Sequence, residues 1–167
     1  MLHCKIIGVS GLPMELTIEV DDLSRPAIAE LLSDHMREMW EVSNPESCHT
    51  LALDKLRTPE VTFWSVWSGD ELVGCGAIKR LNDTHLELKS MRTKPQYQGE
   101  GVGAQLLRHI IAYAEDEGYT RISLETGSSS WFDRACNLYE KFGFTYCEPF
   151  GDYTLDPNSL FMTRTLP

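Results

Sequence analysis

The stretch Gln98-Gly99-Glu100-Gly101-Val102-Gly103 decides the fold, because its three alternating glycines run directly into an amphipathic helix. Without Cβ atoms, consecutive backbone N–H groups can turn toward one point, and a ligand can approach the main chain closely. The helix adds its own first-turn N–H groups and the positive end of its dipole. Turn and helix together predict a binding site for a phosphate group, although glycines at this spacing also occur in ordinary tight connections.

A buried helix follows the glycines. Val102, Leu106, Ile110 and Ala114 recur every four residues, which places them on one face of a helix. Gly118 is typical of the residue just beyond a helix C-terminus. Because the helix begins where the glycines stop, the pattern favours a ligand site over a simple connection.

The kind of phosphate ligand can be narrowed by elimination. A nucleoside triphosphate loop needs a Lys-Ser or Lys-Thr pair after its second glycine, and none is present. The dinucleotide fingerprint is matched loosely by Gly99-x-Gly101-x-x-Ala104, with Glu125 near the position of a ribose-binding acid. However, strand 86–93 is half polar, and too little chain follows for a doubly wound domain. A dinucleotide therefore stays an alternative.

Composition and charge restrict the partners. The 167 residues are 42% hydrophobic, which suits one domain with a substantial core. The formal net charge of −10 disfavours nucleic acid and anionic membrane surfaces, because both need clustered Lys and Arg. A small partner that carries an amine is compatible with this charge.

The cysteines and the hydropathy pattern indicate a cytoplasmic protein. Five cysteines without C-x-x-C spacing indicate neither a disulfide framework nor a zinc site, so we expect no metal and a reducing compartment. No apolar run reaches membrane-spanning length, and the start of the chain lacks the features of a signal peptide.

Periodicity along the chain predicts an α/β fold with a mixed sheet. Strands are expected at about 14–20, 61–67, 72–81, 86–93, 121–124, 144–147 and 159–165, and helices at about 26–42, 51–57, 102–117 and 131–142. The helix after the glycines connects strand 86–93 to strand 121–124 as a right-handed crossover, so these two strands are parallel. We expect six or seven strands, mostly antiparallel, and about four helices.

The predicted domain organisation is simple. One domain spans residues 14–167, and residues 1–13 form an N-terminal extension or a short edge strand of little functional weight.

Two sequence blocks match a known pair of signatures. They are Gln98-x-x-Gly101-x-Gly103 and, further along the chain, Ala135-x-x-Leu138-Tyr139-x-x-x-Gly143-Phe144. In order and separation they resemble the signatures of the GNAT superfamily of N-acetyltransferases, and the resemblance spans residues 14–167. Within it, the runs 89–93, 124–128 and 148–150 are similar to the YsnE-type bacterial branch, which implies no particular substrate.

The resemblance implies acetyl-CoA as acetyl donor, without a metal. Its pyrophosphate would lie on the N–H groups of Gln98, Gly99, Glu100, Gly101, Val102, Gly103 and Ala104. Its pantetheine arm would lie between strands 86–93 and 121–124, along the backbone of Met91, Arg92 and Thr93. An arm with two amides is indeed suited to pair with an exposed strand edge. Nearby cations that could assist are Arg92, Lys94, Arg108 and Arg134.

Glu87 is the candidate general base. Transfer to an amine needs a neutral nitrogen, whereas an alkylammonium with a pKa near 10 is almost fully protonated at neutral pH. The resemblance aligns Glu87 with the catalytic glutamate that some members carry on this strand. Two alternatives stay open: Glu87 is a groove-wall carboxylate paired with Lys89 or His85, or a water chain removes the proton.

Tyr139 is the candidate general acid for the departing thiolate, at the position where the superfamily commonly has this tyrosine. From periodicity alone, Tyr139 is a core residue of its helix. One departure from the family pattern is Phe132, which replaces a common asparagine that contacts the cofactor. Residues 128–130, three serines, are the expected substitute.

The resemblance therefore implies an N-acetyltransferase that moves an acetyl group from acetyl-CoA to a primary amine of a small molecule or amino acid, by direct attack in a ternary complex. The alternatives are acetylation of a protein N-terminus or lysine, and a non-catalytic acyl-CoA-binding sensor. A homodimer is possible. The acceptor depends on loops 40–50 and 148–158, which carry no recognisable pattern.

Overall fold

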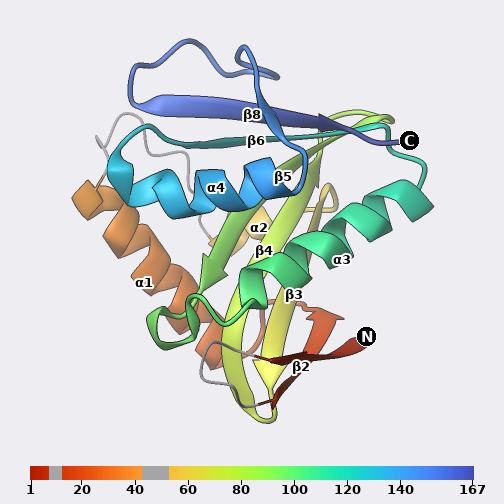
Figure 1. Cartoon of the computed structure of the whole chain (residues 1–167), viewed down its shortest axis with the longest axis vertical. Helices are drawn as coiled ribbons and strands as arrows, with labels where there is room; N and C mark the ends of the chain where they lie inside the picture. The colour runs from red at the N-terminus through yellow and green to blue at the C-terminus, as the bar shows by residue number, and fades with distance from the viewer. Residues whose placement is uncertain (8–12, 43–52) are drawn as a thin grey trace.

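A computed structural model describes residues 1–7, 13–42 and 53–167, and its central feature is one eight-stranded sheet. The strands are β1 (Leu2–Ile7), β2 (Pro13–Val20), β3 (Val61–Ser68), β4 (Glu71–Arg80), β5 (His85–Thr93), β6 (Arg121–Gly127), β7 (Thr145–Tyr146) and β8 (Ser159–Thr165). Their order in the sheet is β1-β2-β3-β4-β5-β6-β8-β7, and only β5 and β6 pair in parallel. Figure 1 shows the helices arranged around this sheet.

The helices of the described part confirm the predicted architecture. They are α1 (Pro26–Val42), α2 (Leu53–Leu56), α3 (Val102–Asp116) and α4 (Asp133–Lys141), with short 3-10 turns η2 (Pro95–Tyr97) and η3 (Ser130–Phe132). The mixed, mostly antiparallel sheet and the parallel crossover through α3 are as the sequence predicts. The sheet has eight strands where six or seven were expected, because Leu2–Ile7 pairs along β2 and buries Ile6 in the main core.

Alternation along β3 explains why both faces of the sheet are covered. Phe63 packs into the cluster that α1 and α2 form on one face, and the next residue, Trp64, packs into the larger cluster under α3 on the other face. Successive residues of a strand point to opposite faces, so this strand needs an aromatic side chain on each. The core is therefore two layers separated by one sheet.

Two glycines of β4 allow α3 to lie close to the sheet. A Cβ atom on Gly76 would stand 3.0 Å from Leu106 Cδ2, and a Cβ atom on Gly74 would stand 3.1 Å from Val102 Cγ1. Both distances are shorter than ordinary van der Waals contact, so larger residues here would push α3 outward. The glycines of β4 thus fix where the N-terminus of α3 lies.

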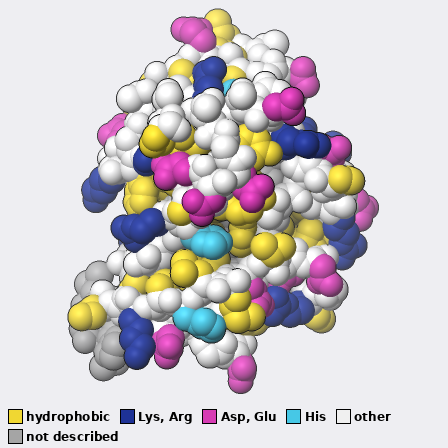
Figure 2. Space-filling view, turned by 90° about the vertical axis from the view of Figure 1, so that its right-hand side faces the viewer, with side chains coloured by type: hydrophobic (Ala, Val, Ile, Leu, Met, Phe, Trp, Pro, Cys, Tyr) yellow, Lys and Arg dark blue, Asp and Glu magenta, His cyan; other side chains and the backbone are white. Residues whose placement is uncertain are grey.

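The surface carries mixed charges. Figure 2 shows acidic and basic side chains interspersed with apolar ones on the face that it presents. Among the helices of residues 1–7, 13–42 and 53–167, none has the length and hydropathy of a transmembrane span.

Candidate active site

A cavity of about 870 Å³ opens where β5 and β6 part. The two strands are paired from His85 and Arg121 as far as Leu88 and Leu124, and beyond this point both continue without pairing to each other. The cavity is lined by the unpaired end of β5, the end of β6, the turn before α3, and residues of α1 and α4. Backbone edges of β5 and β6 are therefore open to a ligand beside the start of α3.

The glycine turn has the geometry of an anion site. Gly99 and Gly101 have φ values of 87° and 90°, and Gly101 is the N-cap of α3 without a side-chain cap. The first intrahelical bond runs from Gln105 N to Gly101 O at 3.0 Å, so the N–H groups of residues 102–104 have no acceptor within the helix. These residues line the cavity together with Gln98 and Gly99.

Two of the seven predicted amide donors are already bonded within the protein. The N–H of Gln98 donates to Pro95 O at 3.3 Å, and the N–H of Glu100 donates to Tyr97 O at 3.3 Å. The Gln98 side chain still lines the cavity, whereas Glu100 is not among its lining residues. The predicted amide donors that are not bonded in this way are those of Gly99, Gly101 and residues 102–104.

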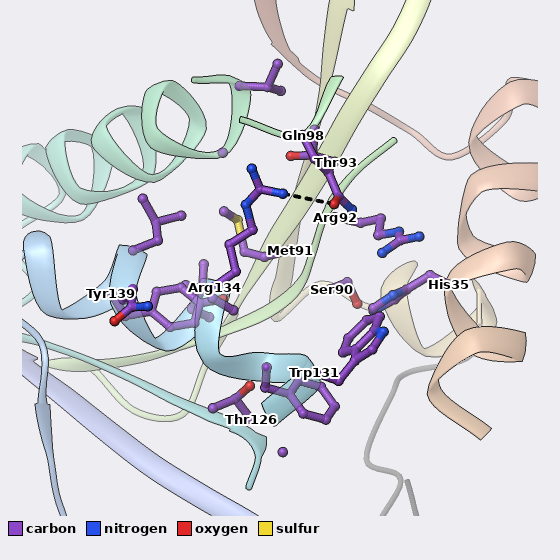
Figure 3. A pocket seen from close by; sticks show the side chains of 18 of the residues that line it. His35, Ser90, Met91, Arg92, Thr93, Gln98, Thr126, Trp131, Arg134 and Tyr139 are labelled. Carbon is purple, nitrogen blue, oxygen red and sulfur yellow. Dashed lines mark hydrogen bonds between the residues drawn. The ribbon is translucent and has the colours of Figure 1, made fainter. Parts of the chain in front are cut away.

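Arg134 of α4 is the candidate cation that lies at this turn. Its Nη1 donates to Gln98 Oε1 at 3.2 Å, as Figure 3 shows, and its Nη2 is 2.8 Å from the point where a Cβ atom on Gly99 would stand. The other candidates have different partners: Arg92 pairs with Glu38, Lys94 lies 4.0 Å from Glu71, and Arg108 donates to Gln105.

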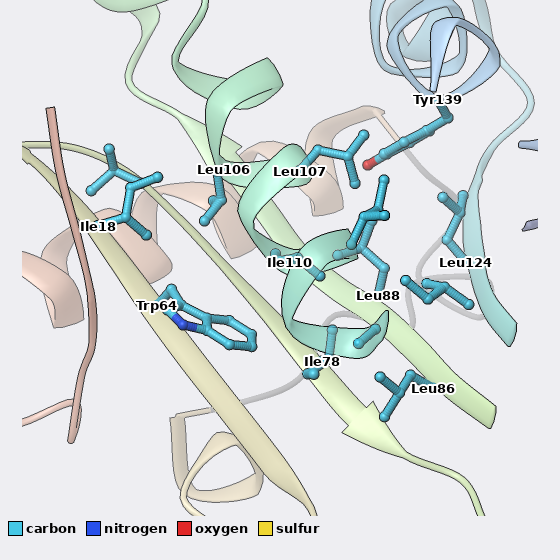
Figure 4. Close-up of a cluster of buried hydrophobic side chains, with 14 of the residues drawn as sticks. Ile18, Trp64, Ile78, Leu86, Leu88, Leu106, Leu107, Ile110, Leu124 and Tyr139 are labelled. Carbon is cyan, nitrogen blue, oxygen red and sulfur yellow. The ribbon is translucent and has the colours of Figure 1, made fainter. Parts of the chain in front are cut away.

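Tyr139 lines the cavity from α4 and is also part of the core, as its helical spacing predicted, while its role as general acid stays a prediction. Its side chain is buried, lies against Phe144 and, in Figure 4, extends toward Leu107 and Leu88. Burial raises the pKa of its phenol above the ordinary value. The phenol therefore stays protonated at neutral pH and can donate a hydrogen bond into the cavity.

Glu87 lies in β5 with only 4% of its surface exposed. Its Oε1 accepts a hydrogen bond from Lys89 Nζ at 2.8 Å and another from the Tyr153 hydroxyl at 2.5 Å. The alternative pairing with Lys89 is thus present, whereas His85 is bonded instead to Ser123 at 2.7 Å. Lys89 lines the cavity, while Glu87 is not among the lining residues.

Tyr153 is a residue that sequence reasoning missed. It lies in the long segment before β8, and its hydroxyl also accepts a hydrogen bond from Lys89 Nζ at 2.9 Å. Burial and the Glu87 carboxylate raise the pKa of its phenol. Only the length of this loop hinted at a role, because no local pattern ties residue 153 to residue 87.

Phe132 stands where the family pattern commonly has a cofactor-binding asparagine, and here its side chain serves packing. The Phe132 ring occupies the space above Gly127, where a Cβ atom would stand 2.0 Å from Cε2. The serines at 128–130 are not among the lining residues, and Ser128 donates its hydroxyl to Pro157 O at 2.9 Å. The side chain of α4 that brings an amide to the cavity is Asn137.

Three polar side chains line the cavity near α1, and of these the sequence had indicated only Arg92, as a residue of the cofactor site. His35 Nδ1, Ser90 Oγ and Arg92 Nε are buried and have no hydrogen-bond partner within the described part of the chain. His35 lies on the buried side of α1 with Leu31, Leu32 and Met39. Burial and the nearby charge of Arg92 lower the pKa of His35 from 6.5 to about 4. The imidazole is therefore neutral at physiological pH.

No group of three or more His, Cys, Asp or Glu side chains suited to hold a metal occurs in the ranges that the structure describes. The cavity offers amides, phenols and charged side chains to a ligand. Parted parallel strands beside an uncapped helix start present backbone edges and N–H groups within this one cavity, as the predicted transferase fold requires.

The family model described as the acetyltransferase (GNAT) family matches residues 25–144. The chain belongs to this family, and it is an N-acetyltransferase that uses acetyl-CoA. It is 55% identical to "Uncharacterized N-acetyltransferase YsnE" of Bacillus subtilis, over 89% of this chain and 99% of the relative. It is 52% identical to "Uncharacterized N-acetyltransferase YedL" of Escherichia coli, over 90% of this chain and 94% of the relative.

A solved structure supports the same fold. The GNAT family acetyltransferase of Elizabethkingia anophelis, determined with acetyl-CoA bound, superposes with a TM-score of 0.66 at 21% identity, and covers 90% of this chain and 98% of its own. The dinucleotide alternative is set aside by the family assignment.

Proposed function

We propose that this N-acetyltransferase acetylates a primary amine of a small molecule or amino acid, by direct attack on acetyl-CoA in a ternary complex. The observation that carries the proposal is the parting of β5 and β6 after Leu88 and Leu124, next to the glycine-capped start of α3. This arrangement offers strand edges to an amide-bearing arm and N–H groups to a phosphate within one cavity.

The cosubstrate is held at two places. The pyrophosphate lies on the amides of Gly99 and residues 102–104, with Arg134 as the nearby cation. The pantetheine arm lies along the backbone of Met91, Arg92 and Thr93, which line the cavity on the unpaired end of β5. These contacts place the thioester between β5 and the Tyr139 phenol.

The acceptor amine must lose a proton before it reacts. Glu87 takes this proton through water or through Lys89, because Lys89 lines the cavity and is bonded to the carboxylate. The Lys89 ammonium also disfavours a second positive charge nearby, so it favours the neutral form of an amine that binds beside it. Tyr153 holds the Glu87 carboxylate in place.

Acetyl transfer then follows in balanced steps. The neutral nitrogen attacks the thioester carbonyl carbon, the new C–N bond forms, and the C–S bond breaks to release CoA thiolate. The second proton of the nitrogen goes to the sulfur, so the products are the N-acetylated amine and the free thiol. Tyr139 donates a hydrogen bond to the departing sulfur, and its raised pKa makes hydrogen-bond donation easier than complete proton transfer.

The test measures release of free thiol from acetyl-CoA against a broad panel of small amines, amino acids and peptides with free N-termini or lysines. We expect turnover with small amines or amino acids and little with peptides. Turnover with peptides alone would replace the proposal by protein acetylation. Acetyl-CoA binding without turnover on any amine would favour the sensor.

A further inference from the structure

We infer that His35, Ser90 and Arg92 form a carboxylate-binding subsite for the acceptor, and that the acceptor is therefore a short amino carboxylate such as an amino acid. The inference rests on the proposed function, because it names the substrate class of the same cavity. It adds a recognition site that neither the glycine turn nor the Glu87 group supplies.

The first argument is the burial of unpaired polar atoms. Buried donors and acceptors in proteins almost always have partners, and each one left unpaired costs about 1–3 kcal/mol. Within the described residues, the buried side-chain atoms without a partner are His35 Nδ1, Ser90 Oγ and Arg92 Nε, and all three residues line the one large cavity. Such a cluster has unused hydrogen-bonding capacity beside the cavity, which a ligand can satisfy once these side chains turn toward it.

The second argument is the chemistry of the three atoms. Arg92 Nε–H can only donate, Ser90 Oγ–H can donate, and a neutral His35 with its proton on Nδ1 donates as well. The terminal Nη2 of Arg92 is already bonded to Glu38 at 2.5 Å, so this pair fixes the guanidinium while Nε is left for a ligand. Three neighbouring donors suit a carboxylate, which is an acceptor-only group.

The third argument is the charge of the cavity. Four basic and two acidic side chains of the described residues line it, although the whole chain has a net charge of −10. The basic residues are Lys89, Arg92, Arg134 and Lys141, and the acidic ones are Glu38 and Glu125. Local positive charge in an acidic protein indicates that the bound molecules are anionic.

The position of the subsite separates it from the cofactor. Figure 3 shows His35, Ser90 and Arg92 close together next to α1, with Tyr139 at the opposite end of the view, and Arg134 bonded to Gln98 at the glycine turn. CoA phosphates bound at the turn leave the three donors near α1 to the second substrate. The subsite lies next to the pantetheine arm, because Ser90 directly precedes Met91. An acceptor that reaches both the subsite and the thioester therefore has only a few bonds between its carboxylate and its amine.

The kinetic test compares amino acids with their primary carboxamides, which keep the amine and lose the carboxylate. We expect the wild type to use the acids with a kcat/KM at least about tenfold higher. Ser90→Ala removes the hydroxyl, and His35→Phe removes Nδ1–H and keeps a planar ring. Each should raise the KM of the acids about tenfold and leave the KM of acetyl-CoA and the kinetics of the amides unchanged.

The matched control is Arg37→Gln. Arg37 lies two residues from His35 in α1, pairs with Asp34 and keeps 65% of its side chain exposed, away from the cavity. This variant should leave both acids and amides unaffected. Equal use of acids and amides by the wild type, or a raised KM of acetyl-CoA in Ser90→Ala, would overturn the subsite while leaving acetyl transfer intact.

A binding measurement tests the subsite independently of catalysis, because it does not require turnover of any amine. Isothermal titration of N-acetylated amino acids and their carboxamides into CoA-loaded protein should show the acids binding at least about tenfold more tightly, with the difference reduced in Ser90→Ala and in His35→Phe. Equal binding of acids and amides refutes the subsite. Absence of thiol release in the panel above refutes the proposed function instead, so the two failures are distinguishable.

Discussion

The His35 imidazole is held neutral inside the molecule, and this makes stability depend on pH. Its pKa is lowered from 6.5 to about 4, so between these values the unfolded chain binds a proton that the folded chain does not. The contribution of His35 to the free energy of unfolding has its full value above pH 6.5. It is lost as pH falls toward 4, by up to about 3 kcal/mol. Urea unfolding of wild type and His35→Gln at several pH values in this window measures it. The two chains should converge at low pH, and parallel pH profiles would contradict the prediction.

Removal of the Glu87 carboxylate should change the pH profile of turnover. In Glu87→Gln we expect kcat/KM to fall about a hundredfold at neutral pH, because proton removal from the ammonium loses its base. The loss should shrink as pH rises toward the pKa of the amine, near 10, because the neutral amine then forms without help. Steady-state kinetics across pH provides the measurement. A loss that is constant with pH would assign Glu87 a structural role with Lys89 and Tyr153.

The Tyr139 hydroxyl should matter for turnover and not for binding. Tyr139→Phe keeps the ring packed against Phe144 and removes only the donor to the leaving sulfur. We expect kcat to fall about a hundredfold, as when one transition-state donor is lost, and the Kd of CoA to stay unchanged. Thiol-release assays and titration calorimetry measure these two quantities. An unchanged kcat would show that Tyr139 serves the core alone.

At the scale of elements, the two left-handed glycines that flank α3 allow an effect on ligand binding to be distinguished from an effect of backbone strain. Gly101 and Gly118 have φ values of 90° and 82° at opposite ends of the helix region, and Gly118 has open space around it. Each change to Ala should destabilise the fold by about 1–2 kcal/mol, because both residues are left-handed. Only Gly101→Ala should also weaken acetyl-CoA binding, by about tenfold. Thermal unfolding and calorimetry test this pair, and equal affinity in both variants would remove the turn from the cofactor site.

The sequence could predict the elements that local patterns encode. Periodicity predicted α1 over residues 26–42, as found, and the alternating glycines predicted a turn that leads directly into α3. It could not predict contacts between distant segments, such as that of Tyr153 with Glu87, because their meeting depends on how a long loop packs on the sheet. The buried polar cluster near α1 was missed for the same reason, since His35 has the spacing of a core residue.

At the scale of the whole molecule, the first strand contributes to stability. Residues 1–13 were expected to have little functional weight, and this stays a prediction, whereas β1 pairs along β2 and buries Ile6. A chain starting at Met14 should lose about 2–3 kcal/mol, from the burial of one large apolar side chain and the strand pairing. Its kcat, measured where it remains folded, should equal that of the full chain. Loss of turnover in the folded truncation would show that β1 supports the site.

The unpaired ends of β5 and β6 also bear on how long the protein survives. A pantetheine arm that pairs with this edge completes the hydrogen bonding of the sheet from outside the polypeptide. A ligand that binds only the folded chain stabilises it in proportion to the logarithm of its concentration. Resistance of the protein to unfolding and proteolysis should therefore rise with the total concentration of coenzyme A and its thioesters, because all of them carry this arm.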